Sequence, residues 1–325
     1  MRRREFLYSA AAAAGVAGLP TAWAAESMGA AQAARAPLTD AKKNDLAKIK
    51  KSTLERIAIM TLNFQRILKV IDVQDSPERT LELFDIGEML ADTYGVHKVE
   101  FQHYHLASTE TSYLKQLRAS LEKAKSRATQ INLEFSDLNI TAPRMRDRIL
   151  AVDLTREWIN HAAVLGAQRV MINQGAPTQE NKAVGIAALK PMVEYGKSKN
   201  IIVSVETRGS GGGRRPDPGS PPPPPTSGKE ANMLLAEIIK GANAYSNVDL
   251  GGARALDQEE LHLCLKTMFP MTANSLHTRV NTAWDLATAM KYLEGELGYK
   301  GLYTIEASNG HEGTQQIYDV IVATL

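Results

Sequence analysis

The sequence predicts an α/β protein whose main domain is a closed (β/α)8 TIM barrel. Eight short apolar runs alternate along the chain with eight longer stretches whose apolar residues recur at helical spacing. This alternation is typical of a parallel sheet with helices outside it, and a chain of 325 residues with 44% hydrophobic content can bury such a core. An open doubly wound sheet is the alternative, but no G-x-G-x-x-G turn follows the first apolar run.

The barrel is expected over residues 55–325, where the apolar runs have the length of strands and the amphipathic stretches have the length of helices. In chain order, strands are expected at Ile57–Leu62, His97–Phe101, Gln130–Phe135, Arg169–Asn173, Ile201–Glu206, Ser246–Leu250, Thr272–His277 and Gly301–Glu306. Helices are expected at Thr80–Tyr94, Thr111–Ala128, Arg146–Leu165, Asn181–Lys199, Lys229–Gly241, Gln258–Phe269, Trp284–Leu297 and His311–Leu325.

One segment interrupts this alternation. Residues Gly209–Gly228 hold seven of the fourteen prolines and have no apolar periodicity, which predicts a disordered Pro/Gly-rich insertion after the fifth strand. Loops that follow strands lie on the catalytic face of a barrel, so the insertion is expected beside the site. A lid, a docking segment and an inert surface insertion all remain open.

The N-terminus has the pattern of a twin-arginine signal peptide over residues 1–24. Arg3 and Arg4 precede Glu5-Phe6-Leu7, an alanine-rich apolar stretch follows, and Ala22-Trp23-Ala24 fits a cleavage site. A polar extension is expected over residues 25–54. The protein is therefore expected to leave the cytoplasm through the twin-arginine export machinery and to be periplasmic or secreted.

Charge argues against a nucleic-acid-binding protein, and cysteine content excludes a protein stabilised by internal disulfides. The signal carries three arginines and one glutamate, so its removal changes the formal net charge from +2 to 0. A neutral mature protein argues against a nucleic-acid partner, because phosphate binding needs a concentrated basic surface. Cys264 is the only cysteine, so an internal disulfide is impossible and the core must hold the protein together.

Four consecutive expected strands end in a residue that can bind a divalent cation. These residues are Glu206, Asp249, His277 and Glu306, and the barrel would bring them to one face. Each of them alone is more often a helix cap or a solvated loop residue. Together, hard carboxylate oxygens and one imidazole suit one divalent metal, namely Mn²⁺, Co²⁺, Mg²⁺ or Zn²⁺. A metal would also explain why several carboxylates gather at the ends of buried strands.

With these residues and the segment "LADTYGVHKVEFQ" at Leu90–Gln102, residues 55–325 resemble the sugar phosphate isomerase/epimerase family of xylose-isomerase-like barrels, which includes the ketose 3-epimerases. The resemblance implies an isomerase or epimerase that abstracts a proton next to the carbonyl of a sugar or keto-sugar, through an enediolate. It implies that Glu206 and Glu306 are catalytic as well as metal ligands, and that Asp249 and His277 complete the site.

Two positions depart from the family pattern. Gly252 stands where the ketose epimerases carry a histidine, and Ala283 stands where they carry a substrate-binding arginine; Arg279 or Arg254 could substitute. A metal-dependent lyase or hydratase acting on keto-sugars or keto-glycosides is therefore an alternative. A sugar-binding barrel without turnover is another, and a homo-oligomer also stays open.

Other polar residues near expected strand ends could bind sugar hydroxyls. They are Gln102, His103, His105 and Asn173, for which ordinary loop capping is the alternative. Glu100 alternates with Val99 and Phe101 and could point into the barrel. A buried carboxylate needs a partner, such as a lysine or an arginine.

Overall fold

The structure is a computed structural model that describes residues 46–70, 76–135, 138–172, 177–207, 228–251, 253 and 255–325. The expected signal segment, most of the expected polar extension and residues 209–227 of the expected insertion lie outside these ranges. In the described part of the chain, no helix is long and apolar enough to cross a membrane.

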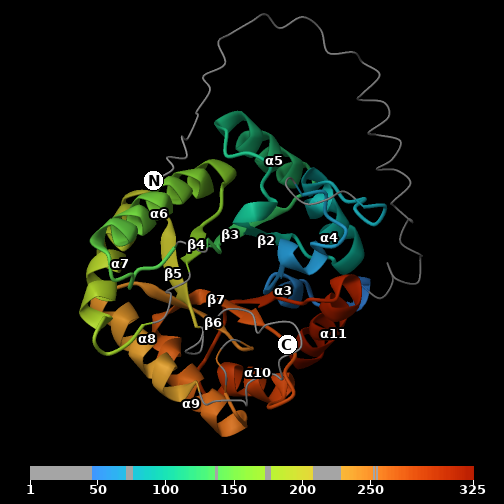
Figure 1. Ribbon diagram of the computed structural model, residues 1–325. Helices are drawn as coiled ribbons and strands as arrows, with labels where there is room; N and C mark the ends of the chain where they lie inside the picture. The colour runs from blue at the N-terminus through green and yellow to red at the C-terminus, as the bar shows by residue number, and fades with distance from the viewer. Residues whose placement is uncertain are drawn as a thin grey trace, which may run out of the picture. The chain divides into compact units, whose positions relative to one another are not determined.

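Eight parallel strands in the described residues close into a barrel, in which each strand pairs with the next and β8 returns to β1 (Figure 1). This confirms the predicted (β/α)8 fold. The strands are β1 (Ile57–Met60), β2 (Lys98–Gln102), β3 (Arg127–Leu133), β4 (Arg169–Ile172), β5 (Ile202–Glu206), β6 (Tyr245–Asp249), β7 (Thr272–Thr278) and β8 (Leu302–Ile305).

The α-helices surround the strands in chain order (Figure 1). They are α3 (Lys51–Leu54), α4 (Ile86–Tyr94), α5 (Thr111–Lys123), α6 (Met145–Leu165), α7 (Lys182–Ser198), α8 (Lys229–Ala242), α9 (Gln258–Met268), α10 (Leu286–Gly295) and α11 (Gly310–Thr324). Short 3-10 turns are η1 (Thr61–Phe64), η2 (Leu83–Asp85), η3 (His103–His105) and η4 (Phe269–Met271).

Two expected elements start three or more residues away from the observed start. The helix expected from Thr80 begins only at Ile86, because Leu81 forms a β-bridge with Leu68 and keeps the chain extended. The strand expected from Gln130 begins at Arg127, because the barrel ladder places Arg127 beside Lys98 on β2. Both differences come from pairing with distant segments, which periodicity does not report.

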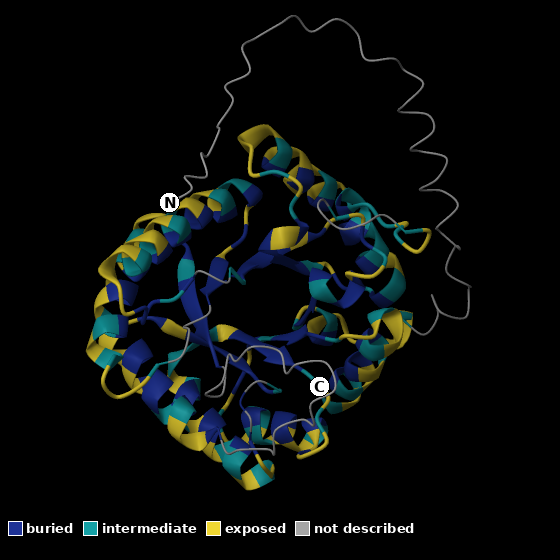
Figure 2. Cartoon of the chain, in the orientation of Figure 1, coloured by how far each residue is buried: buried dark blue, intermediate teal, exposed yellow. Residues whose placement is uncertain are grey.

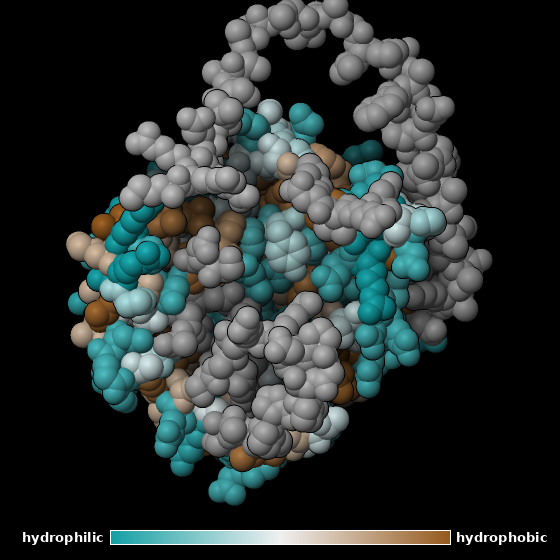
Figure 3. Space-filling view, in the orientation of Figure 1, coloured by the Kyte–Doolittle hydropathy of each residue, from teal (hydrophilic) through white to brown (hydrophobic). Residues whose placement is uncertain are grey.

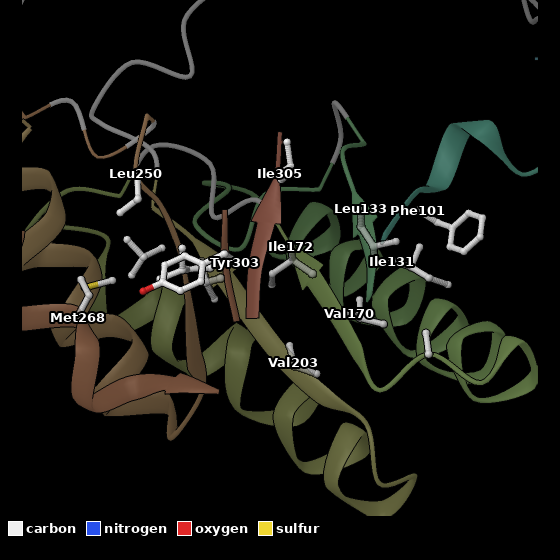
Figure 4. Packing of buried hydrophobic residues seen from close by; sticks show 14 of the residues in the cluster. Phe101, Ile131, Leu133, Val170, Ile172, Val203, Leu250, Met268, Tyr303 and Ile305 are labelled. Atoms are coloured by element: carbon white, nitrogen blue, oxygen red, sulfur yellow. The ribbon is translucent and has the colours of Figure 1, made fainter. Parts of the chain in front are cut away.

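The apolar core lies between the barrel and the helices. Alternate residues of the strands point outward into it, as Val170, Ile172 and Val203 do in Figure 4. Figure 2 shows the same division, with buried strands inside and exposed residues on the outer faces of the helices. Outward positions of the strands therefore supply most of the hydrophobic stabilisation.

The inward positions of the barrel are mostly polar, whereas bulky aliphatic residues usually fill such an interior. The buried apolar residues at inward positions of the described strands are Ala58, Met60 and Met171. The buried polar and charged residues at inward positions are Glu100, Gln102, Gln130, Asn132, Arg169, Ser204, Glu206, Asn247, Asp249, Ser275, His277 and Thr304. Because burial of a polar group without a partner is costly, these side chains must bond to one another or to a ligand.

Candidate metal centre

The barrel brings the four strand-end residues to one end of its axis. Glu206 and Asp249 are the last residues of β5 and β6, His277 is the last but one of β7, and Glu306 directly follows β8. Asp249 and His277 are direct neighbours in the β6–β7 ladder. All four are at most 5% exposed, so these ionisable groups meet in a site largely shielded from water.

Three of the four converge closely enough to share one ion. His277 Nδ1 lies 3.1 Å from Glu206 Oε1 and 3.2 Å from Glu306 Oε2. One ligand atom from each residue falls within 4.8 Å of the others. Two buried carboxylates and an imidazole nitrogen facing one another are a donor set suited to a divalent cation, so the residues fit the metal that the sequence predicts.

Asp249 lies beside this group and is engaged with an arginine. Its Oδ1 accepts a hydrogen bond from the backbone N–H of Gly251 at 2.9 Å, and its Oδ2 lies 3.2 Å from Nε of Arg279. Arg279 Nη2 also donates to Glu306 Oε1. Burial, aided by the charge of Glu306 and opposed by Arg279, raises the pKa of Asp249 to about 7. A nearby cation would lower this pKa and favour the carboxylate as a ligand.

The second ring nitrogen of His277, Nε2, faces the carboxylate of Glu100. Its Nε2 lies 2.6 Å from Oε1 of Glu100, and both side chains are fully buried. Burial opposes the charged imidazolium, but the charge of Glu100 and the hydrogen bonds to Glu100, Glu206 and Glu306 outweigh it and raise the pKa of His277 well above its ordinary value. Glu100 therefore points into the barrel and has a basic partner, as expected, but this partner is a histidine and not a lysine or an arginine.

Sequence reasoning missed the polar residues that hold Glu100. Asn132 Nδ2 donates to Glu100 Oε1 at 2.7 Å, and Gln130 Nε2 donates to the same oxygen at 3.2 Å. Gln130 and Asn132 alternate with Ile131 and Leu133, which was a signal that both face inward. The signal did not say what they bind, because Glu100 lies 30 residues or more away along the chain.

The other expected sugar-binding residues are buried near the same end of the barrel. Gln102 is fully buried, and neither its side-chain oxygen nor its nitrogen has a hydrogen-bond partner among the described residues. His103 packs on Phe135, with 3.8 Å between the ring centroids, and its Nδ1 accepts from the backbone N–H of Glu134. His105 Nδ1 lies 2.8 Å from Oγ1 of Thr61. Asn173 and Arg254 are outside the described residues.

A cavity of about 300 Å³ adjoins the group at Glu306 and Arg279. This volume is at the lower end of the usual range for ligand pockets, about 300–1,000 Å³. Its polar lining includes Gln65, Arg279, Glu306, Ser308, Asn309 and Gln316. Figure 3 shows hydrophilic residues gathered at the centre of this view along the barrel. The cavity thus offers space for a small molecule next to the carboxylate of Glu306.

The structure is similar to solved structures of carbohydrate enzymes. A D-tagatose 3-epimerase-like protein has 16% sequence identity and a TM-score of 0.61, with 83% of this chain and 98% of that chain covered. This chain has the xylose-isomerase-like barrel fold. A xylose isomerase-like TIM barrel protein from Mycobacterium smegmatis, in complex with magnesium, has 13% identity and a TM-score of 0.57 over 85% of this chain and all of that one.

A third structure with this xylose-isomerase-like fold is 3-keto-D-glucoside 4-epimerase from E. coli, with 10% identity, a TM-score of 0.59, and coverage of 83% of this chain and 100% of that chain. No protein-family model matches the chain, and no curated protein sequence matches it. At these identities the similarity establishes the xylose-isomerase-like fold, and the chemistry must be argued from the residues of this chain.

Proposed function

We propose that the protein is a divalent-metal-dependent sugar isomerase or epimerase that abstracts a proton next to the carbonyl of a sugar or keto-sugar. The observation that carries this proposal is the buried group of Glu206, His277 and Glu306, which adjoins a cavity at Glu306 that is lined in part by polar side chains. The epimerases and isomerase-like proteins that share the fold support the same class of reaction.

Glu206, His277 and Glu306 would hold the cation, and Asp249 would join them once its carboxylate turns from Arg279. The cation would be Mn²⁺, Co²⁺, Mg²⁺ or Zn²⁺, since each accepts carboxylate and imidazole ligands. Bound there, it would polarise a sugar carbonyl and so make the neighbouring C–H bond more acidic.

The carboxylates of Glu206 and Glu306 would move the proton. They come from β5 and β8, which are separated in the barrel by β6 and β7, and each approaches His277 Nδ1 from its own strand. One carboxylate within hydrogen-bond reach of the substrate carbon can accept its proton, and the other, if it carries a proton, can donate that proton to the opposite side of the carbon. Exchange with solvent would then restore both carboxyl groups. Arg279, which lines the cavity, would orient a sugar oxygen by donating hydrogen bonds.

The test begins with metal content and then follows hydrogen exchange. The purified protein should hold about one divalent ion per chain, and His277→Ala and Glu306→Gln should lose it or bind it at least about tenfold more weakly. Glu312→Gln is the matched control, because Glu312 is an exposed glutamate on α11 six residues after Glu306. A panel of keto-sugars in heavy water should then take up deuterium at the carbon next to the carbonyl with wild type.

The same panel separates the alternatives. Epimerisation conserves the mass of the sugar apart from deuterium, whereas a lyase or hydratase releases or adds a group. Bound metal without deuterium uptake in any sugar would support a sugar-binding barrel without turnover. Absence of metal even after Mn²⁺, Co²⁺ or Zn²⁺ is supplied would exclude the proposed enzyme.

We also propose that the protein is exported by the twin-arginine machinery. The basis is the ordered pattern of Arg3-Arg4, apolar stretch and Ala22-Trp23-Ala24. The exported protein should begin at Ala25 on N-terminal sequencing, and replacement of Arg3 and Arg4 by lysine should keep it in the cytoplasm. Export of this double variant at the wild-type level would contradict the proposal.

A further inference from the structure

Glu100 is a buried carboxylate inside the barrel that is not one of the proposed metal ligands. Its side chain is fully buried, and its Oε1 lies 2.6 Å from Nε2 of His277. It is separated from His277 by 177 residues along the chain. A buried carboxylate costs free energy in any fold, so a leucine or methionine would fill this position more favourably if packing were its only task.

Glu100 is itself held in place by two amides on the neighbouring strand β3. Its Oε1 accepts from Asn132 Nδ2 at 2.7 Å and from Gln130 Nε2 at 3.2 Å. Gln130 Nε2 also lies 2.9 Å from Asn132 Oδ1 and 3.3 Å from Asn247 Oδ1. These residues come from β2, β3 and β6, so the oxygen that faces His277 is fixed by strands and not by a loop.

The geometry decides which imidazole nitrogen is available to a metal. Because Nε2 faces Glu100, it must carry the proton of that hydrogen bond, which leaves Nδ1 as the nitrogen that faces Glu206 and Glu306. Rotation of the ring by half a turn would remove Nε2 from Glu100 and place carbon atoms at both positions. The carboxylate thus selects one tautomer and one ring orientation.

We propose that Glu100 is a positioning residue that holds His277 with its proton on Nε2, so that Nδ1 is the ligand atom. This inference rests on the metal site of the proposed function, and Glu100 acts on the ion only through His277. A carboxylate that accepts a hydrogen bond from the far nitrogen of a ligating histidine orients the ring and makes the nitrogen a stronger donor. The loss of such a partner typically weakens metal binding about 10–100-fold.

The experiment compares Glu100→Gln and Glu100→Leu with wild type in the full-length mature protein. Glutamine keeps the shape and offers one neutral oxygen, whereas leucine offers no acceptor. Ser204→Ala is the matched control, because Ser204 also faces the barrel interior but bonds to the backbone oxygen of Val170 and not to His277. Titration with Zn²⁺ and Co²⁺ should give affinities in the order wild type, Glu100→Gln, Glu100→Leu, with about a 10–100-fold loss at the end of the series.

A spectroscopic measurement separates orientation from general damage. In ¹⁵N-histidine-labelled, Zn²⁺-loaded wild type, His277 should show a metal-bound Nδ1 and a slowly exchanging downfield proton on Nε2. That proton should exchange faster in Glu100→Gln and disappear or move to Nδ1 in Glu100→Leu, while Ser204→Ala keeps the wild-type pattern. If Glu100→Leu does not fold, the metal titration and the ¹⁵N spectrum of Glu100→Gln test the proposal.

Wild-type affinity and an unchanged Nε2 proton in Glu100→Gln would overturn the positioning role while leaving the metal site intact. If wild type binds no metal, the proposed function fails, and the ligand role proposed for Nδ1 fails with it. The spectrum of the metal-free protein then tests the pairing of Glu100 with His277. If the Nε2 proton is protected in wild type and this protection is lost in Glu100→Gln, Glu100 orients the ring without a metal.

Discussion

Three buried histidines near the mouth of the barrel show how the surroundings set the charge of one side chain. Burial lowers the pKa of His103 and of His105 to about 4, since neither has a carboxylate partner that outweighs it. Burial acts in the same direction on His277, but Glu100 reverses the outcome and raises its pKa. His103 and His105 are therefore neutral at pH 7, whereas the surroundings of His277 favour its charged form.

His105 makes the stability of the fold depend on pH. Its pKa is about 4 when folded and about 6.5 when unfolded, so protonation favours the unfolded chain. Its contribution to stability is complete above pH 6.5 and is lost as the pH falls towards 4. Between pH 7.5 and 5 the free energy of unfolding should fall by about 2 kcal/mol on account of this residue.

Urea denaturation of wild type and His105→Asn across this pH range measures the effect. The asparagine amide can still bond to Thr61 Oγ1, which His105 Nδ1 contacts, but it does not titrate. The variant should therefore lose less stability on acidification than wild type. Parallel curves for the two proteins would mean that His105 does not carry the effect.

At the scale of the elements, close approach of two strands depends on one glycine. A Cβ at Gly301, just before β8, would lie 2.4 Å from the backbone oxygen of Asn274 on β7. Gly301→Ala should thus destabilise the fold by about 1–3 kcal/mol or more, because backbone and not a flexible side chain must move. Gly295→Ala is the control, since a Cβ there meets nothing within 4 Å and Gly295 ends α10.

Thermal unfolding of the two glycine variants gives opposite expected outcomes. Gly295→Ala should leave the stability unchanged or raise it by up to about 1 kcal/mol, because alanine is the better helix former. Equal stability of Gly301→Ala and Gly295→Ala would contradict the close strand packing.

The start of β1 is tied to α10 by an ion pair with two hydrogen bonds. Arg56 donates to the carboxylate of Glu294 at 2.9 and 2.6 Å, and Tyr303 donates its hydroxyl proton to the same carboxylate at 2.7 Å. Arg56→Met should destabilise the protein by about 2 kcal/mol, below the value for a fully buried pair because both side chains are 19% exposed. Glu294 would then remain half-buried without its main cation.

The control for this pair is Lys69→Met. Lys69 and Glu82 form an ion pair that is more than 40% exposed on both sides, which should contribute under about 0.5 kcal/mol. Denaturant midpoints of the two variants measure the difference. If Arg56→Met is as stable as Lys69→Met, the junction of β1 and α10 does not depend on this pair.

At the scale of the whole molecule, Cys264 reports the integrity of the apolar layer between barrel and helices. It lies on α9 with 2% of its surface exposed, and burial raises the pKa of its thiol to about 12. The native protein should resist a thiol-reactive reagent at pH 8, and labelling should occur only through unfolding. Labelling rates at increasing urea concentration, with fully unfolded protein as the control, test this.

The labelling rates give the free energy of the opening that exposes Cys264. This value should match the global free energy of unfolding, because α9 packs on the closed barrel. A much smaller value would show that α9 opens separately while the rest stays folded. Such a result would contradict a single cooperative core.

The sequence by itself determined the order of strands and helices, because burial on both faces of a strand and on one face of a helix leaves a local pattern. It also placed Glu206, His277 and Glu306 at strand ends, and barrel closure then brings these ends together. The starts of β3 and α4 were not determined locally, because pairing with β2 and with Leu68 fixed them.

Only the tertiary structure decided which side chains meet across the barrel axis. It paired Asp249 with Arg279, left three residues in the close group, and gave His277 a buried carboxylate partner in Glu100. Such contacts join residues far apart in the chain, so they depend on register and closure and leave no periodic signal. The physical reason is that periodicity records whether a side chain is buried, whereas chemistry depends on which atom it is buried against.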